Sequence, residues 1–162
     1  MKARHTIRAL VVLVAAVALT AVAAAGPNVA KQRVAIDMQG GQSFVLLPLQ
    51  PGSLKRDSGP SNANPQAGRS FMRDGQRVSI YNINYTLSGK QGDLTIQERN
   101  EWVDVSQKNA RGFDYRPGVA IGTWKVVSGT NAYAKVVGGG RSAHAGMGKQ
   151  WFIRLEGYLT TK

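Results

Sequence analysis

The stretch that most constrains the fold of this chain is residues 122–141, GTWKVVSGTNAYAKVVGGGR. Its pattern predicts a strand, a Gly-Thr turn, one tight helical turn and a Gly-rich start of the next strand. Glycine placed where a curved sheet must bend is typical of a β-barrel. The stretch holds no nucleophile with a base, no metal-ligand set and no nucleotide-binding loop. It therefore indicates an architecture rather than a reaction.

The N-terminus indicates export. Basic residues in the first eight positions precede an apolar run at residues 9–19, and small residues fill positions 21–25. A charged head, an apolar middle and an A-x-A ending are the three parts of a cleavable signal peptide. We therefore expect a signal-peptide helix over residues 1–25, with cleavage before Gly26.

A membrane anchor is the alternative for this segment, because residues 9–25 have roughly the 17-residue minimum that spans a bilayer. The run is only mildly hydrophobic and no aromatic belt follows it, so we favour cleavage and no stable membrane span afterwards. The sequence contains no cysteine, which excludes disulfides and a lipid-modified N-terminal cysteine. We expect a periplasmic or extracellular protein whose fold is held by its core alone.

The mature chain, residues 26–162, has a length that fits one domain with a single core. The whole sequence carries 21 Lys and Arg against 9 Asp and Glu, and such an excess favours polyanionic neighbours. The basic residues are scattered without a dense run, and no nucleic-acid motif accompanies them. We therefore expect no specific nucleic-acid binding, and keep a polyanion as a possible partner.

Alternating apolar residues predict β-strands through the mature chain, and no long helical period appears. Residues 33–49 predict two strands, or one strand broken by a bulge at a Gly-Gly pair. Residues 50–70 consist mainly of turn formers and charges, so we expect a long irregular loop there. We interpret this loop as mobile and without chemistry.

The second half of the chain continues the β pattern. Residues 76–87 change phase at Tyr81, which predicts a bulge near that residue. The turn GKQG at residues 89–92 leads into a strand at 93–105. In the last segment, alternate positions place four apolar residues on one face: Trp151, Ile153, Leu155 and Leu159.

Six to eight strands joined mostly by short turns favour one closed barrel, because closure removes exposed strand edges. The fold prediction is an all-β chain with a single small antiparallel β-barrel of about eight strands, preceded by the signal-peptide helix. A two-sheet sandwich is the alternative. Coordinates that place the strands of Trp102 and Trp151 in separate layers would contradict the barrel.

Several motifs stand in order here: GTW at 122–124, VV at 126–127, SGT at 128–130, AYA at 132–134 and GGGR at 138–141. Together they resemble exported bacterial proteins of the allene oxide cyclase and dirigent barrel group. Asn131 stands where that group usually has a second turn glycine, and asparagine tolerates the left-handed backbone well.

The upstream pieces DSG at 57–59, DGQ at 74–76 and LSGK at 87–90 with EW at 101–102 are also similar to such sequences, so the resemblance covers most of the mature chain. It implies a small eight-stranded barrel that is open at one end and often oligomeric. It carries no reaction over, because the catalytic residues of the plant members have no matching positions in this sequence.

Polar residues at inward positions are the candidate chemistry. In the predicted strand 93–105, the face that carries Leu94 and Ile96 also carries Glu98 and Asn100. A carboxylate inside a barrel must be paired or hydrogen-bonded, so Glu98 indicates a polar cavity that holds or polarises a ligand. The alternatives are a bulge near Asn100 that leaves Glu98 in solvent, or an ion pair between Glu98 and an arginine.

Three tyrosines complete the candidate ligand-binding set: Tyr81, Tyr85 and Tyr158, which could line the mouth of the barrel. Packing of these rings in the core or between strands is the alternative. His144 is the only histidine after the leader, and without cysteine or a nearby carboxylate pair it predicts no metal site. No partner that would make it a general base is visible in the sequence. We assign no catalytic residue, no metal and no cofactor.

Three function classes remain. We expect an exported, non-enzymatic barrel that binds a small apolar or amphipathic molecule, or a partner, at its open end. The second class is an isomerase or cyclase-like enzyme without a metal, in which Glu98, Asn100 or a tyrosine steers the ligand. The third is an envelope protein that binds polyanions through its basic surface. A homo-oligomer is compatible with all three.

Overall fold

The computed structural model describes residues 31–66, 68–104, 107–108, 114–115, 117–147 and 150–162. The predicted signal peptide, residues 1–25, lies outside these ranges. Within them, no helix is both long and apolar enough to cross a membrane.

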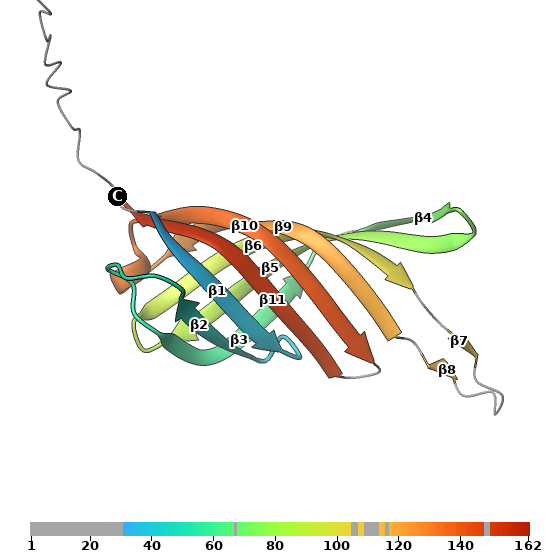
Figure 1. Ribbon diagram of the computed structural model, residues 1–162, viewed down its shortest axis with the longest axis horizontal. Helices are drawn as coiled ribbons and strands as arrows, with labels where there is room; N and C mark the ends of the chain where they lie inside the picture. The colour runs from blue at the N-terminus through green and yellow to red at the C-terminus, as the bar shows by residue number, and fades with distance from the viewer. Residues whose placement is uncertain (1–30, 67, 105–106, 109–113, 116, 148–149) are drawn as a thin grey trace, which may run out of the picture.

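Eight antiparallel strands close into a single β-barrel (Figure 1). Around the barrel the order is β3-β2-β1-β11-β10-β9-β6-β5, and the pairing of β3 with β5 closes the ring. The predicted all-β barrel is therefore confirmed and the two-sheet sandwich is excluded. The barrel strands are β1 (Lys31–Gln39), β2 (Ser43–Pro48), β3 (Asp57–Pro65), β5 (Gln76–Gly89), β6 (Gly92–Asp104), β9 (Pro117–Gly129), β10 (Val136–Met147) and β11 (Gln150–Thr161).

Three short strands and one helical turn complete the fold. β4 (Arg69–Arg73) pairs with the start of β5, and the two project from the barrel as a hairpin (Figure 1). β7 (Gln107–Lys108) and β8 (Asp114–Tyr115) form a separate two-stranded pair. η1 (Asn131–Tyr133) is the helical turn expected between β9 and β10.

The turn around η1 follows its sequence closely. Asn131 has a φ of 49°, in the left-handed region that asparagine tolerates. The hydroxyl of Thr130 accepts a hydrogen bond from the backbone N–H of Asp93, 2.9 Å away. Residues 122–141 thus form the predicted strand, helical turn and strand. The hydrogen bond between Thr130 and Asp93 connects this turn to β6.

The prediction of an irregular loop at residues 50–70 is wrong for residues 57–65, where β3 lies, and for residues 69–70, where β4 begins. β3 is built from Asn, Ser, Gly and Pro with mostly exposed side chains, so it shows no apolar alternation. Asp57 at its start is buried and accepts hydrogen bonds from the backbone of the β5–β6 turn. The neighbouring strands β2 and β5, and not its own side chains, specify this strand.

The predicted bulge near Tyr81 is also wrong, because β5 pairs with β6 in one continuous register. Near its N-terminus β5 leaves the barrel to pair with β4, and the consecutive residues Val78 and Ser79 are both buried there. This breaks the alternation without a bulge. A register shift does occur between β6 and β9 after Thr95, where Val127 is the extra, exposed residue.

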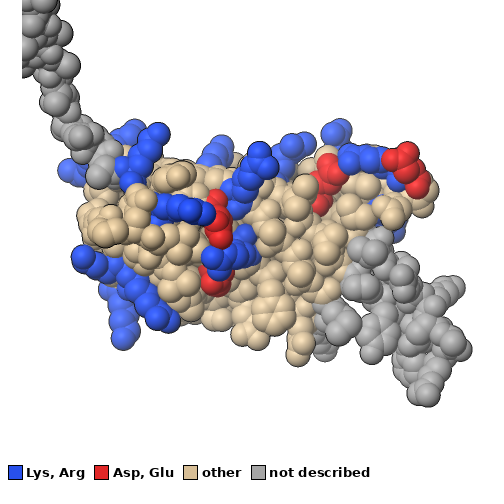
Figure 2. Space-filling view, in the orientation of Figure 1, with Lys and Arg blue, Asp and Glu red and all other residues tan. Residues whose placement is uncertain are grey.

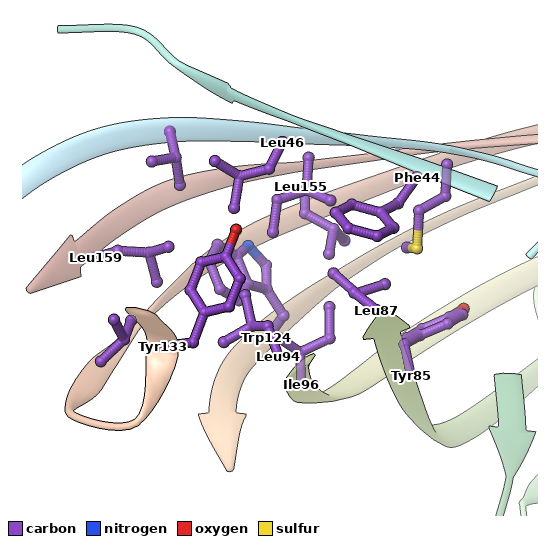
Figure 3. Close-up of a cluster of buried hydrophobic side chains, with 14 of the residues drawn as sticks. Phe44, Leu46, Tyr85, Leu87, Leu94, Ile96, Trp124, Tyr133, Leu155 and Leu159 are labelled. Carbon is purple, nitrogen blue, oxygen red and sulfur yellow. The ribbon is translucent and has the colours of Figure 1, made fainter. Parts of the chain in front are cut away.

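Apolar side chains fill the barrel interior from the end where η1 lies (Figure 3). Trp124 is buried and stands in the same cross-strand row as Gly140 and Gly157. Its Nε1 donates a hydrogen bond to the backbone oxygen of Arg141, 3.1 Å away. The buried apolar cluster comprises Val34, Ile36, Met38, Phe44, Leu46, Leu54, Tyr85, Leu87, Leu94, Ile96, Trp124, Tyr133, Val136, Ile153, Leu155 and Leu159.

Candidate functional site

A buried polar cluster lies inside the barrel, beyond the apolar core as seen from the η1 end. Glu98 on β6 is 0% exposed and His144 on β10 is 8% exposed. His144 Nε2 lies 2.6 Å from Glu98 Oε1. Asn100 Nδ2 donates a hydrogen bond to the other oxygen, Glu98 Oε2, over 3.3 Å. The carboxylate is therefore held on both oxygens.

Tyr85 is the fourth member of this polar cluster. Burial raises the pKa of the Tyr85 phenol, and the charge of Glu98 and a hydrogen bond to it raise the pKa further. Figure 3 shows the Tyr85 hydroxyl pointing away from the labelled apolar side chains. Tyr85 therefore stays neutral beside Glu98, in a setting where an unpaired charge would be strongly disfavoured.

The strand register explains how Glu98 and His144 meet although β9 runs between their strands. Glu98 pairs with Trp124 of β9, and His144 pairs with Ala120 of β9. Gly122 is the residue between Ala120 and Trp124 on the same inner face, since side chains alternate along a strand. Because Gly122 has no side chain, Glu98 and His144 can reach each other over β9.

Two further polar atoms lie in the adjacent cross-strand row, which runs from Asn100 through Gly122 to Ser142. Asn100 Oδ1 and Ser142 Oγ are both buried, and neither has a hydrogen-bond partner among the described residues. A buried polar atom without a partner costs about 1–3 kcal/mol. These two atoms, which lie beside the polar cluster, can therefore form hydrogen bonds with a polar group of a ligand.

Two tryptophans close this end of the barrel, which we call the Trp end. The rings of Trp102 and Trp151 meet edge to face, with centroids 4.6 Å apart. A Cβ on Gly118 would overlap the Trp102 ring, and one on Gly146 would overlap the Trp151 ring. The glycines therefore make room for the indoles. The strands of Trp102 and Trp151 belong to one barrel and not to separate layers.

The five predicted ligand-binding residues lie in different parts of the structure. Glu98, Asn100 and Tyr85 point inward and lie together, as the alternation predicted for the first two. Tyr81 lies directly opposite Asn100 on β5 but is 39% exposed, at the edge of the cluster. Tyr158 is 50% exposed on the outer wall and does not line the interior. Its neighbours Gly157 and Leu159 take the inward positions instead.

Sequence reasoning missed the role of His144, which had no visible partner. The contact with Glu98 spans 46 positions of sequence and crosses an intervening strand. One signal was present: the alternation that buries Ser142 also places His144 inward on β10. The decisive information, the register of β9 against both neighbours, is not a local property of the sequence.

The arrangement can bind polar groups and can exchange protons. Because Glu98 engages Nε2, the imidazole of neutral His144 presents its second nitrogen, Nδ1, as the proton acceptor. A carboxylate that orients a histidine in this way is a common element of acid–base sites. In the part of the chain that the structure describes, no group of three His, Asp or Glu side chains is placed to hold a metal ion.

Comparison with known proteins yields no match to any family model, any curated protein or any solved structure. The function is therefore inferred from the geometry of the site itself.

Proposed function

We propose that the protein is an exported barrel that binds a small amphipathic molecule inside the Trp end. The observation that carries the proposal is the presence of two buried, unpartnered polar atoms, Asn100 Oδ1 and Ser142 Oγ, next to the Glu98–His144 pair. A ligand with one hydrogen-bond donor would satisfy Asn100 Oδ1, and its oxygen would accept from the Ser142 hydroxyl.

Energetics support a functional role for the polar cluster. A buried ion pair or buried polar pair is often replaceable by apolar residues with no loss of stability. The barrel already has a large apolar core, so Glu98 and His144 add little that leucines would not supply. Their presence in the interior is therefore better explained by recognition or chemistry than by folding.

The surroundings define the chemical class of the ligand. The edge-to-face pair Trp102 and Trp151 offers an apolar aromatic surface for a hydrocarbon or aromatic body. A carboxylate ligand would meet Glu98 within the same enclosure, and like charges repel strongly where water is excluded. An alcohol, phenol or amide therefore suits the site better than an acid. The resemblance to the allene oxide cyclase and dirigent group supports a barrel that uses its interior in this way.

A matched pair of probes tests the proposal. 2-Naphthol carries a hydroxyl donor, and 2-methoxynaphthalene has the same ring system without the donor. We expect wild-type protein to bind 2-naphthol about tenfold more tightly, the equivalent of one buried hydrogen bond. Asn100→Ala should remove most of this preference, because Asn100 Oδ1 is the acceptor for the probe's hydroxyl. Thr86→Ala, which removes an exposed hydroxyl on the same barrel, should not. Equal binding of the two probes by wild type would contradict the proposal.

A second candidate function is an isomerase or cyclase-like activity, which the 2.6 Å contact between His144 and Glu98 favours. In this function His144 Nδ1 removes a proton from the carbon next to a carbonyl and returns it after rearrangement, while Glu98 holds the imidazole in place. Exchange of the α-hydrogens of cyclohexanone with heavy water, followed by NMR, tests it. Acceleration by wild type that is lost in Glu98→Gln supports the enzyme; equal rates in both leave binding as the function.

A further inference from the structure

The outer wall of the barrel carries a groove on the opposite face of the sheet from the polar cluster. It has a volume of about 690 Å³ and crosses β5, β6, β9, β10 and β11. Arg99, Thr123 and Arg141 lie directly opposite one another on three neighbouring strands and form one row of its lining. The next row contributes the apolar residues Ile121 and Ala143.

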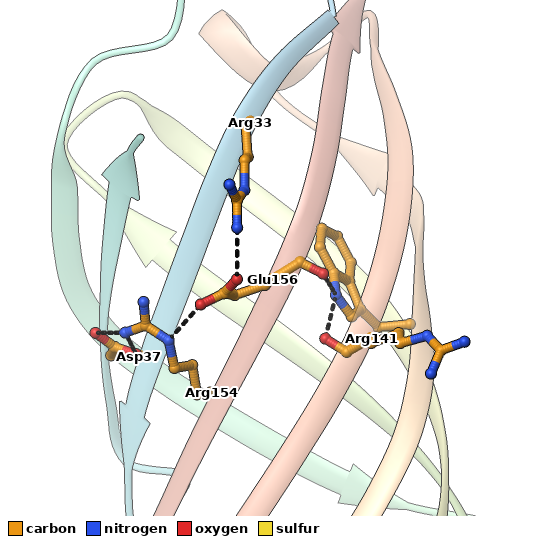
Figure 4. Close-up of polar contacts among 6 residues, drawn as sticks. Arg33, Asp37, Arg141, Arg154 and Glu156 are labelled. Carbon is orange, nitrogen blue, oxygen red and sulfur yellow. Dashed lines mark hydrogen bonds and ion pairs between the residues drawn. The ribbon is translucent and has the colours of Figure 1, made fainter. Parts of the chain in front are cut away.

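The two acidic side chains that line this outer groove are already engaged by arginines. Glu101 accepts two hydrogen bonds from Arg73, at 2.5 and 3.3 Å. Glu156 accepts from Arg33 at 3.2 Å and from Arg154 at 2.8 Å (Figure 4). On the face shown in Figure 2, the acidic side chains lie beside basic ones, whereas many basic side chains stand apart from any acid.

Arg99 and Arg141 are left without such compensation, since neither forms an ion pair with any other described residue. Arg141 is directly opposite Glu156, yet Figure 4 shows its guanidinium pointing away from that carboxylate toward β9. Two strand spacings of roughly 4.8 Å separate the backbones of Arg99 and Arg141. Two long arginine side chains can converge on one anion over that span, with the Thr123 hydroxyl between them.

We propose that the outer groove binds a phosphate monoester. The planar guanidinium matches phosphate oxygens with two parallel hydrogen bonds, and two arginines balance the two charges of the ester near neutral pH. Ile121, which is 72% exposed, and Ala143 provide an apolar surface beside the anion for a short hydrocarbon or aromatic substituent. Most of the lining faces outward, and the row of Asn100, Gly122 and Ser142 also contributes to it. The anion is held by Arg99 and Arg141, which the function proposed for the interior does not use.

Phenyl phosphate is the probe, titrated by calorimetry at constant ionic strength, with benzoate as a singly charged analogue. Arg99→Gln and Arg141→Gln should each weaken phenyl phosphate binding about tenfold or more, the range for loss of a charge-assisted pair. Lys125→Gln is the matched control, because Lys125 is exposed on β9, two residues from Thr123, and outside the groove. It should change the affinity less than about twofold, as a rim charge does.

The pH dependence is a second readout. A phosphate monoester loses its second proton near pH 6, so affinity should rise between about pH 5 and pH 7, whereas benzoate binding should not. Vesicles of phosphatidylcholine with and without phosphatidic acid identify the source of the phosphate. Cosedimentation that Arg141→Gln abolishes assigns it to a lipid headgroup, and binding of phenyl phosphate alone assigns it to a free ester.

Three results would overturn the site: equal affinity for phenyl phosphate in wild type, Arg99→Gln and Arg141→Gln; equal affinity for benzoate and phenyl phosphate; or no binding of either the probe or the phosphatidic acid vesicles. Thermal melts of each variant show whether a loss of binding reflects the groove or the fold. The arginines are exposed, so we expect the melts to agree with wild type.

Discussion

His144 Nε2 approaches Glu98 Oε1 to 2.6 Å by reaching over Gly122, the residue that separates their rows on the inner face of β9. The contact joins β6 to β10 without involving a side chain of the strand between them. It makes one carboxylate and one imidazole a single buried unit, so removal of either member changes the state of the other.

Removal of either Glu98 or His144 alone should therefore destabilise the fold far more than replacement of both. His144→Ala leaves the fully buried Glu98 without its imidazole, and we expect a loss of about 3–5 kcal/mol in the free energy of unfolding. Glu98→Leu combined with His144→Leu removes the polar pair and should recover most of that loss. Urea denaturation of the three proteins measures both effects.

The double variant also separates stability from function. It should fold but should no longer prefer 2-naphthol to 2-methoxynaphthalene, because the polar surroundings of Asn100 and Ser142 are gone. A double variant that is as unstable as His144→Ala would show that the pair is needed for folding. That result would contradict a purely functional role of the cluster.

Gly122 should be intolerant of any side chain. A Cβ there would lie 2.5 Å from the backbone oxygen of Arg99, 2.7 Å from Ser142 Oγ and 2.8 Å from Asn100 Cα. Gly122→Ala must push β6 or Ser142 away, and we expect it to destabilise the barrel by about 1–3 kcal/mol, as overpacking does. Thermal or urea unfolding measures this, and the preference for 2-naphthol should fall with it.

Gly75→Ala is the control for this substitution. Gly75 has a φ of 77° but open space around its missing Cβ, and it lies where β4 turns into β5 on the projecting hairpin. The change should introduce only backbone strain, about 1–2 kcal/mol, and leave probe binding unaltered. A loss of the 2-naphthol preference in Gly75→Ala would mean that general destabilisation, and not the crowding of Asn100 and Ser142, explains the effect at Gly122.

The barrel could be predicted from the sequence because inward-facing apolar residues alternate with outward-facing residues along most of its strands. In β11, Ile153, Leu155 and Leu159 are all buried, as the period of two predicts. β3 carries almost no such signal, because its side chains are mostly exposed and its place is set by hydrogen bonds to β2 and β5. A strand specified by its neighbours cannot be recognised from its own residues.

The same distinction applies to the candidate site. The inward position of Glu98 follows from the alternation of one strand, so it could be predicted. Its pairing with His144 depends on how β9 is registered against β6 and β10, and the exposure of Tyr81 depends on where β5 leaves the barrel. These are properties of the closed ring, which local patterns do not contain. The outward position of Tyr158, by contrast, follows from the alternation of β11.

Asp57 should make the stability of the protein depend on pH in the acid range. Burial raises the pKa of Asp57, but hydrogen bonds from the Gln91 N–H, the Tyr133 hydroxyl and the N–H groups of Ser58 and Lys90 outweigh it, so the pKa is lowered overall. A lowered pKa contributes stability above the unfolded value of about 3.9, and that stability is lost as the pH falls through the folded value.

Asp57→Asn tests this expectation. At about pH 7 the variant should be less stable by about 1–3 kcal/mol, because the β5–β6 turn loses a charged acceptor. Below about pH 4 its stability should depend less on pH than that of wild type, since the titrating group is absent. Urea unfolding across this range measures the two slopes. Identical slopes would show that Asp57 is not the group responsible.

Tyr85 and Tyr133 should control the alkaline limit of the fold. Burial is the main cause that raises the pKa of each phenol, and the nearby carboxylates Glu98 and Asp57 add to it. A raised pKa means that the stabilisation is complete below the unfolded value of about 10 and is lost as the pH rises above it. Phenolate absorbance should therefore show two of the five tyrosines ionising only together with unfolding.

Tyr85→Phe and Tyr133→Phe test this expectation. Each should remove one phenolate from the cooperative step. Ionisation of Tyr85 in the folded barrel would contradict its burial beside Glu98.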